Sequence, residues 1–337
     1  MNSKKIIKNT LNILLPILLG VAILWWMYKG FDFSRVADTL LHGTNWWWMA
    51  FSLVFGVTAQ VFRGLRWKQT LAPLGEHPST ADCIHAIFIS YTTSLIIPRS
   101  GEMVRCGILS KYDGTSFSKS LGTVVAERAI DSLLLLFLAV LVFFLQIDLF
   151  MSFLDATGTS FSDALIHMNA LGYIIVAVCT IVLIGLFWIL VKRFEIFARL
   201  VKIFKNIKDG VFSLKDVSNK WLFVAYTIGI WGSYFLHFYT TFFCFEFTKD
   251  LGIDVAIAAF IVGSFAVIVP TPNGMGSWHF AVKTVLLLSG VKSAANAETF
   301  ALIVHAIQTA LMPVLGIYST IALLQKGGRH KQTDHNQ

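Results

Sequence analysis

Six long apolar runs, separated by shorter polar segments, divide the chain. A membrane-spanning helix needs about 17–25 predominantly apolar residues, and the runs are of about this length. They are Leu11–Tyr28, Trp46–Phe62, Ala129–Ile147, Ala170–Val191, Trp221–Phe245 and Phe300–Leu324. We therefore predict an all-α, polytopic membrane protein with six full spans.

Two further segments, Leu71–Arg128 and Gly252–Thr299, are apolar but broken by proline and glycine. Their first apolar legs, Asp82–Ile97 and Val255–Val269, are short for a full span. Proline ends a helix and glycine lets the backbone turn, so each break favours a reversal of the chain. We predict two re-entrant hairpins; two full spans in place of each hairpin is the alternative that the pattern leaves open.

The positions of lysine and arginine predict the orientation of these spans. Basic residues gather in the N-terminal segment, after the second run, in the connection 192–220 and in the polar tail 326–337, whereas Asp148–Asn169 contains none. Cytoplasmic segments carry the excess of positive charge, so both termini are predicted to lie in the cytoplasm. We expect a multi-pass protein of the cell (inner) membrane.

The two halves of the chain show the same order of segments. Residues of about 5–150 and 168–325 each read as span, span, broken hairpin, span, but the first half starts inside and the second starts outside. This order predicts an inverted-topology repeat within one integral membrane domain, 1–337. In such repeats the binding site lies near the midplane, where the broken helices meet.

Composition supports a membrane protein and excludes other classes. The chain is 56% hydrophobic and 14% charged, against about 25% charged residues in soluble domains. The net charge of +8 follows from the basic flanks of the spans, so we expect no nucleic-acid partner. The four cysteines form no CxxC pair, and no nucleotide-binding or metal motif is present, so no cofactor is expected.

Charged residues near or within the apolar segments are the first candidates for a site. They are Arg63, Arg66, Arg99, Glu102, Arg105, Glu127, Arg128 and Asp131. A charge at the bilayer centre costs about 2.5–3.5 kcal/mol on insertion scales, so such residues are usually paired and functional. The arginines are expected to hold a phosphate bidentately, while the carboxylates orient them or bind a coupling proton.

Two structural alternatives stand beside this interpretation. Arg63 and Arg66, with Lys68, would lie among the lipid head groups as an ordinary basic flank. The remaining charges would form an ion-pair network that only holds helices together.

The second break, "PTPNGMG", supplies the other candidates. Gly274 and Gly276 would let the backbone turn and approach a ligand closely. Asn273 and His279 would contact the ligand or a proton, whereas a lone membrane histidine such as His305 is more often a helix-to-helix hydrogen bond. A Ser277–His279 catalytic pair is not expected, because residues two apart do not face each other on a helix.

Four motifs in order carry a family resemblance: "RGLRW" (63–67), "PRSGEMVR" (98–105), "VVAERAID" (124–131) and "PTPNGMG" (270–276). With them the chain resembles, from about Lys5 to Leu324, the transmembrane region of lysylphosphatidylglycerol synthases, also described as flippase-like membrane proteins. It departs from the family pattern at Pro98, which directly precedes the arginine, at Asn273, where a glycine is usual, and at His279, where a glutamate is usual.

The resemblance implies movement of lysylated or other phospholipids between leaflets, often beside a soluble aminoacyl-transferase domain that we do not find here. We expect a translocase for a lipid with an anionic head group: a phospholipid, a modified phospholipid or a polyprenyl-phosphate-linked glycan. The alternatives are an intramembrane enzyme that uses Glu102, Glu127 or Asp131 on a lipid phosphate, an accessory subunit of a lipid or cell-envelope synthase, and a small-anion transporter. An enzyme is not expected, because no catalytic constellation is complete. A glycosyltransferase or other lipid-modifying enzyme is a conceivable partner; the sequence predicts no oligomeric state.

Overall fold

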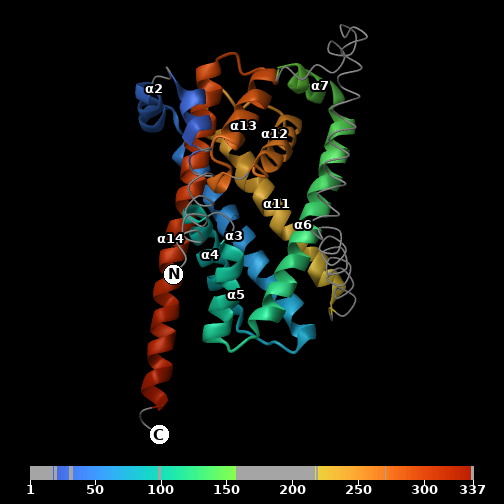
Figure 1. Cartoon of the computed structure of the whole chain (residues 1–337). Coiled ribbons are helices and arrows are strands. Elements are labelled where there is room, and N and C mark those ends of the chain that lie inside the picture. Colours follow the sequence, from blue (N-terminus) through green and yellow to red (C-terminus); the bar gives the residue numbers. More distant parts are fainter. Residues whose placement is uncertain are drawn as a thin grey trace, which may run out of the picture.

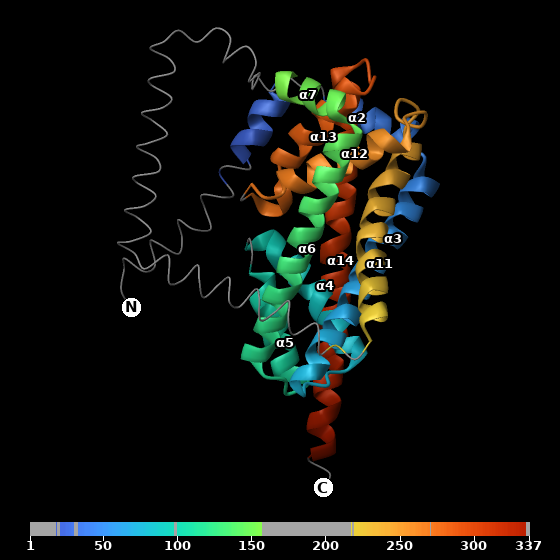
Figure 2. The ribbon, with the colours of Figure 1, turned by 90° about the vertical axis from the view of Figure 1, so that its right-hand side faces the viewer.

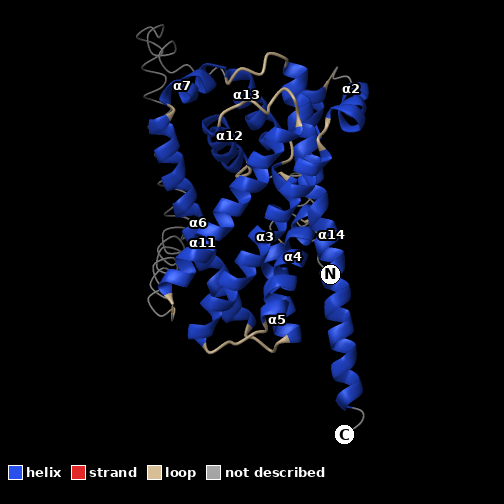
Figure 3. Ribbon diagram, turned by 180° about the vertical axis from the view of Figure 1, so that it is seen from behind, coloured by secondary structure: helices blue, strands red, loops and turns tan. Residues whose placement is uncertain are grey.

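The computed structural model describes residues 18, 21–29, 33–97, 100–156, 217, 219–269 and 271–334. In these ranges the chain forms helices joined by turns and bends, with no strand (Figure 3). The predicted all-α class is therefore confirmed. The predicted span 170–191 and most of the connection 192–220 lie outside the described residues, as do Pro98, Arg99 and Pro270.

Fourteen elements follow one another in the described ranges. They are α2 (Phe33–Asp38), the π-helical η1 (Thr39–Gly43), α3 (Trp46–Leu71), η2 (Ala72–Leu74), α4 (Thr80–Ile96), α5 (Gly101–Tyr112), α6 (Phe117–Leu145), α7 (Ile147–Ala156), α11 (Lys220–Tyr239), η4 (Thr240–Cys244), α12 (Ile253–Ala266), η5 (Pro272–Gly274), α13 (Ser277–Leu288) and α14 (Ala294–Asp334). Residues 21–28 are also helical. Figure 1 shows their arrangement.

Three described helices are long and apolar enough to cross a membrane. They are Trp46–Leu74, Phe117–Leu145 and Ala294–Lys326. Each extends a predicted span by a turn or more, because the polar residues that end an apolar run do not end the helix. The segment 117–128, for example, is polar in sequence but forms the first turns of α6.

α3 and α11 form a long antiparallel pair, α14 packs along α4, and Figures 1 and 2 show these helices side by side. Small residues allow the close approach that membrane helices use. A Cβ atom on Gly229 would lie 2.8 Å from Phe62, and one on Gly316 would lie 2.1 Å from the Thr92 hydroxyl. We call the end of the molecule at which α3 begins the Trp46 end, and the other the Leu71 end.

The helices α4 and α5 make a hairpin at the Leu71 end. The Ser79 amide, which precedes α4, donates to Asp113, which follows α5, so the pair enters and returns at one end. The chain also comes close at the first turn of α5: a Cβ atom on Gly101 would lie 2.0 Å from the Ser90 carbonyl oxygen. Glycine is therefore required where α5 crosses α4.

The helices α12 and α13 make the second hairpin, at the Trp46 end. Gln146, at the end of α6, donates to the Asp254 carbonyl in the first turn of α12. Figure 1 shows α12 and α13 in the upper half of the molecule and α5 in the lower half. The turn η5 of the second hairpin contacts α4 of the first, so the two hairpins meet between the ends.

Two clusters of buried side chains hold these elements together. The larger, toward the Trp46 end, contains Phe238, Phe242, Phe245 and Phe300, whose rings meet edge to face. Such aromatic pairs contribute about 0.5–1.5 kcal/mol beyond the burial of their surface. The smaller cluster, toward the Leu71 end, centres on Trp67 and joins α3 to α4, α5 and α6.

Candidate functional site

A chain of buried ion pairs joins α3, α5 and α6. The Asp131 carboxylate accepts from Arg63 Nη1 at 2.9 Å and from Arg66 Nη2 at 2.8 Å. The Glu127 carboxylate lies 3.6 Å from Arg66 Nε and accepts from Arg105 Nη2 at 2.9 Å. These contacts follow from the sequence, because residues three or four apart lie on one face of a helix.

Burial sets this cluster apart from an ordinary basic flank. The side chains of Arg66 and Glu127 are 0% exposed, and that of Arg63 is 3% exposed. Both α3 arginines are therefore enclosed by protein and paired with carboxylates of α6, whereas an ordinary basic flank would be exposed. Lys68 donates to the Thr80 hydroxyl instead. The Arg105 guanidinium also stacks over the Trp67 ring, 4.6 Å from its centroid.

Arg128 is the most accessible of the four described arginines in this cluster. Its Nε atom lies 3.3 Å from a Glu102 carboxylate oxygen, and the two side chains are 41% and 44% exposed. The described cluster then contains four arginines and three carboxylates, so it carries a net charge of +1. An excess positive charge in a partly open position suits an anion.

A cavity of about 440 Å³ lies between the two halves of the chain. Its lining comes from α3, α4, α6, α11, α12, η5, α13 and α14: Gln60, Arg63, Tyr91, Arg128, Asp131, Ser132, Leu135, Trp231, Tyr234, His237, Phe238, Phe260, Ser264, Val267, Asn273, Trp278, His305, Gln308, Thr309 and Met312. Three members of the charged cluster, Arg63, Arg128 and Asp131, thus share a cavity with the second broken hairpin. The charged cluster and the second break therefore meet at this cavity.

Hydrogen-bonded tyrosines line the cavity beside Arg63. The Tyr234 hydroxyl accepts from Gln60 Nε2 at 3.1 Å and shares a hydrogen bond with the Tyr91 hydroxyl at 3.0 Å. The Arg63 guanidinium lies 5.7 Å from the centroid of the Tyr234 ring, a cation–π distance. These contacts fix the position of Arg63 without consuming all its donors, since its Nε has no hydrogen-bond partner in the described residues.

At the second break the backbone turns through positive φ angles at Asn273 and at the two glycines expected to allow the turn. Asn273 is left-handed at φ 51°, and Gly274 and Gly276 have φ angles of 72° and 88°. Asparagine tolerates this region better than other side chains, which explains its place here. The Asn273 Nδ2 atom donates to the Thr309 hydroxyl at 2.8 Å, and the Asn273 backbone carbonyl accepts from His305 Nε2 at 3.1 Å. These hydrogen bonds join the break to α14.

The structure places His279 behind the cavity rather than in its lining. Its ring turns back to the start of α13, where Nδ1 accepts from the Gly276 amide at 3.3 Å. His305, which sequence reasoning set aside, lines the cavity instead, and the two rings are 4.5 Å apart. In this geometry His279 shapes the break, and Asn273 is the member of the predicted pair that faces the cavity.

Sequence reasoning also missed the polar residues of α14. His305, Gln308 and Thr309 line the cavity, next to the apolar Met312. The three polar residues recur at the i, i+3 and i+4 spacing of one helix face, so a polar stripe on an otherwise apolar helix was the available signal. Within the described ranges, no group of three or more histidines, cysteines or carboxylates is placed to hold a metal ion.

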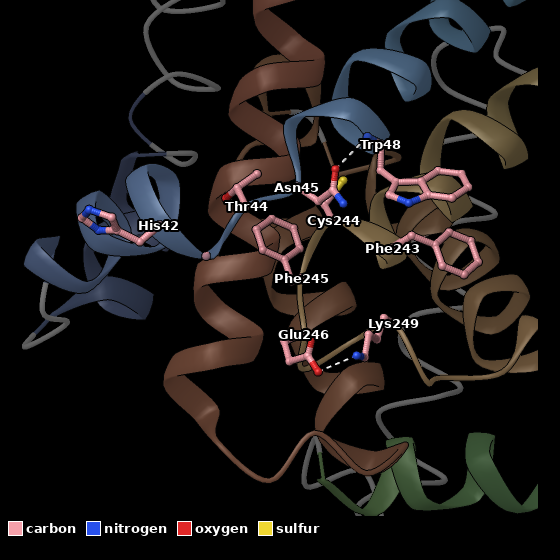
Figure 4. A pocket seen from close by; sticks show the side chains of 10 residues that line it. His42, Thr44, Asn45, Trp48, Phe243, Cys244, Phe245, Glu246 and Lys249 are labelled. Atoms are coloured by element: carbon pink, nitrogen blue, oxygen red, sulfur yellow. Dashed lines mark hydrogen bonds and ion pairs between the residues drawn. The ribbon is translucent and has the colours of Figure 1, made fainter.

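A second pocket, of about 590 Å³, lies toward the Trp46 end between η1 and the segment that follows η4 (Figure 4). Its polar side chains have partners of their own. Lys249 pairs with Glu246, as Figure 4 shows, and the Asn45 side chain accepts from the amides of Trp47 and Trp48 at the start of α3. This pocket contains none of the charged cluster, so the cavity between the halves is the better candidate site.

Comparison with known proteins points to one family. The family model described as the lysylphosphatidylglycerol synthase TM region matches residues 13–316. Searches of curated proteins and of solved structures returned no match.

Proposed function

The chain belongs to the family of the lysylphosphatidylglycerol synthase transmembrane region, and we propose that it is a translocase that moves a lipid with an anionic, phosphate-bearing head group between leaflets. The family and the apolar helices make it a multi-pass membrane protein, and the family is associated with lipid and cell-envelope synthesis. The finer assignment rests on one observation: Arg63 and Arg128 open into a cavity that both halves of the chain enclose.

In this proposal the phosphate binds at the arginines while the acyl chains stay in the lipid. Arg128 would exchange its exposed partner Glu102 for the phosphate, and Asp131 would keep Arg63 in place. Guanidinium groups suit this role because their planar donors match phosphate oxygens bidentately. The bound head group would then lie between the two hairpins.

The cavity would be exposed to the two leaflets in turn because the two halves of the chain are oppositely oriented in the membrane. We propose that α3–α6 and α11–α14 belong to inverted repeats, that the hairpins are re-entrant and that both termini are cytoplasmic in the cell membrane. Rocking of one repeat against the other would open the cavity to each leaflet in turn. A lipid-modifying enzyme or a glycosyltransferase would be a suitable partner for such a translocase.

The same geometry speaks against an intramembrane enzyme. In the enzyme alternative, Glu102, Glu127 or Asp131 would act as general acid or base and would have to reach the substrate. Asp131 and Glu127 each contact two arginines, and Glu102 is not among the residues that line the cavity. Binding and movement of an anion therefore need fewer rearrangements than acid–base catalysis.

A reconstitution experiment tests the proposal. The purified protein is placed in vesicles with fluorescent phosphatidylglycerol or fluorescent phosphatidylcholine, and leaflet exchange is followed by chemical quenching of the outer leaflet. We expect phosphatidylglycerol to exchange faster than in protein-free vesicles and faster than phosphatidylcholine. Exchange no faster than in protein-free vesicles, for phosphatidylglycerol and several other anionic lipids, would refute the proposal.

A further inference from the structure

Beyond Arg63, Arg128 and Asp131, the described lining of the cavity combines apolar side chains with uncharged polar groups. Side-chain amides come from Gln60, Asn273 and Gln308, and hydroxyl groups from Ser132, Ser264, Thr309 and the two tyrosines. Trp231 and Trp278 add aromatic faces. Small-molecule sites use such a combination of apolar surface and a few placed polar groups to orient the ligand.

The charge of the one carboxylate in this lining is already balanced by arginine. Both Asp131 oxygens accept from arginine, Oδ2 from Arg63 and Oδ1 from Arg66. The neighbouring Glu127 is 0% exposed and contacts Arg66 and Arg105, and Glu102, the partner of Arg128, is not among the described lining residues. An ammonium group entering the cavity would therefore find no carboxylate with an unpaired charge among the described lining residues.

Electrostatic repulsion would add to that loss. Arg63 and Arg128 lie in the same cavity, where charges interact more strongly than in water because the surroundings are less polarisable. The tryptophan faces could attract a cation, but such contacts are weak compared with repulsion by the net positive charge of this lining, two arginines against one carboxylate, in a confined space. The charge balance of the cavity therefore disfavours a positively charged head group.

Unpaired polar atoms of the lining point to hydroxyl groups as ligands. Gln60 is 1% exposed, and its Oε1 atom has no hydrogen-bond partner in the described residues. The Nε1 atom of Trp231 also has no hydrogen-bond partner there. One atom accepts and the other donates, and a hydroxyl group can serve both. Buried polar atoms without a partner are costly, so a ligand or water that satisfies them is favoured.

We propose that the cavity selects a phosphodiester lipid whose head group is a neutral polyol or a single sugar. The phosphate binds at Arg128 and Arg63, and the hydroxyl groups bind the amides and lie against the tryptophan rings. A volume of about 440 Å³ is within the usual range of about 300–1,000 Å³ for small-molecule sites. This inference rests on the proposed function and narrows its substrate to exclude aminoacylated, cationic head groups.

A competition experiment tests this selectivity without requiring transport. The purified protein in detergent binds fluorescent phosphatidylglycerol, which is displaced by phosphatidylinositol, lysylphosphatidylglycerol or phosphatidic acid with identical acyl chains. We expect phosphatidylinositol to compete at least about tenfold better than lysylphosphatidylglycerol, because a confined ammonium group would lack a partner. Equal or better competition by lysylphosphatidylglycerol would overturn the inference.

A pair of variants tests the electrostatic cause. The Ser264 hydroxyl donates only within its own helix, to the Phe260 carbonyl, so this position of the lining tolerates change. Ser264→Asp adds a carboxylate, and Ser264→Asn is its neutral control of similar size. Relative to Ser264→Asn, Ser264→Asp should shift the preference toward lysylphosphatidylglycerol by roughly tenfold. An unchanged preference would contradict the electrostatic basis of the selectivity.

The two proposals fail in different ways. If wild-type protein shows the predicted head-group preference but no leaflet exchange, the selectivity stands and the translocase proposal fails. If leaflet exchange occurs equally for lysylphosphatidylglycerol and phosphatidylinositol, and binding shows no preference, the translocase proposal stands and the selectivity fails.

Discussion

At the scale of single residues, Asp131 is the acceptor that organises the charged cluster. It accepts from two arginines of α3, and its side chain is only 9% exposed. Removing one partner of a buried ion pair leaves the other uncompensated, which is more damaging than losing an exposed pair. The cluster therefore stabilises the fold as well as placing Arg63 at the cavity.

Asp131→Asn should lower the free energy of unfolding by about 3–5 kcal/mol, because two buried guanidinium groups lose their charged partner. The matched control is Glu102→Gln, whose exposed pair with Arg128 should contribute no more than about 1 kcal/mol. Thermal unfolding of both variants in detergent measures the difference. Equal destabilisation by the two changes would show that burial does not distinguish these pairs.

The sequence identified most of these charged residues but not their exposure. Arg63 and Arg66 are three residues apart on one helix face, and both pair with Asp131 in the structure. Which arginine stays accessible depends on how α5 and α6 pack, and no local pattern encodes that packing. His279 was chosen for its nearness to the break, whereas its ring turns back to the Gly276 amide.

At the scale of elements, the crossing of α4 and α5 depends on one glycine. Gly101→Ala would bring a Cβ atom to 2.0 Å from the Ser90 carbonyl oxygen, so the hairpin would have to open. Gly107→Ala, in the same helix, meets nothing within 4 Å and should stabilise α5 by up to about 1 kcal/mol. We expect opposite shifts of the melting temperature. A neutral or stabilising Gly101→Ala would contradict this packing.

A carboxylate holds the start of α6 at the Leu71 end. Glu76 pairs with Lys119 and accepts from the Ser116 amide, and these hydrogen bonds lower the pKa of Glu76 below its usual range. A depressed pKa in the folded state means that this stabilisation is present above the unfolded pKa of about 4.3 and is lost as pH falls through the folded value.

Glu76→Gln should therefore destabilise the protein at pH 7 and have a diminishing effect below about pH 4. Melting temperatures of wild type and variant, measured in detergent between pH 3 and pH 7, give the two curves. Their separation should shrink as the pH falls. Curves that stay parallel over the whole range would show that the Glu76 contacts do not stabilise the folded state.

Element boundaries were predicted well where apolar runs meet proline or glycine, and less well elsewhere. The legs Asp82–Ile97 and Val255–Val269 match α4 and α12 within a few residues. The start of α6 was placed too late, because ion pairs let a polar segment continue the helix. The end of α11 was placed too late, because the apolar run continues through the 3₁₀ turn η4.

At the scale of the whole molecule, the two halves place their hairpins at opposite ends. The cavity lies where the turn of one hairpin contacts a helix of the other. The order of segments predicts two hairpins that enter from opposite faces, but it cannot predict which side chains line the cavity. The polar face of α14 and the tyrosines beside Arg63 come together only through contacts between distant segments.

The central claim is that arginines in this cavity hold the phosphate of a moving lipid. Arg128 tests it best, because it lines the cavity and its pair with Glu102 is exposed, so its loss should spare the fold. Arg35→Ala is the matched control, since Arg35 lies near the Trp46 end and donates to Asn296.

The deciding measurement is leaflet exchange of fluorescent phosphatidylglycerol in vesicles that contain wild type, Arg128→Ala or Arg35→Ala at equal protein content. We predict that Arg128→Ala slows exchange by roughly tenfold or more, as expected for loss of a charged hydrogen bond to phosphate, and that Arg35→Ala exchanges like wild type. Exchange by Arg128→Ala at the wild-type rate, in protein of unchanged melting temperature, would contradict the account.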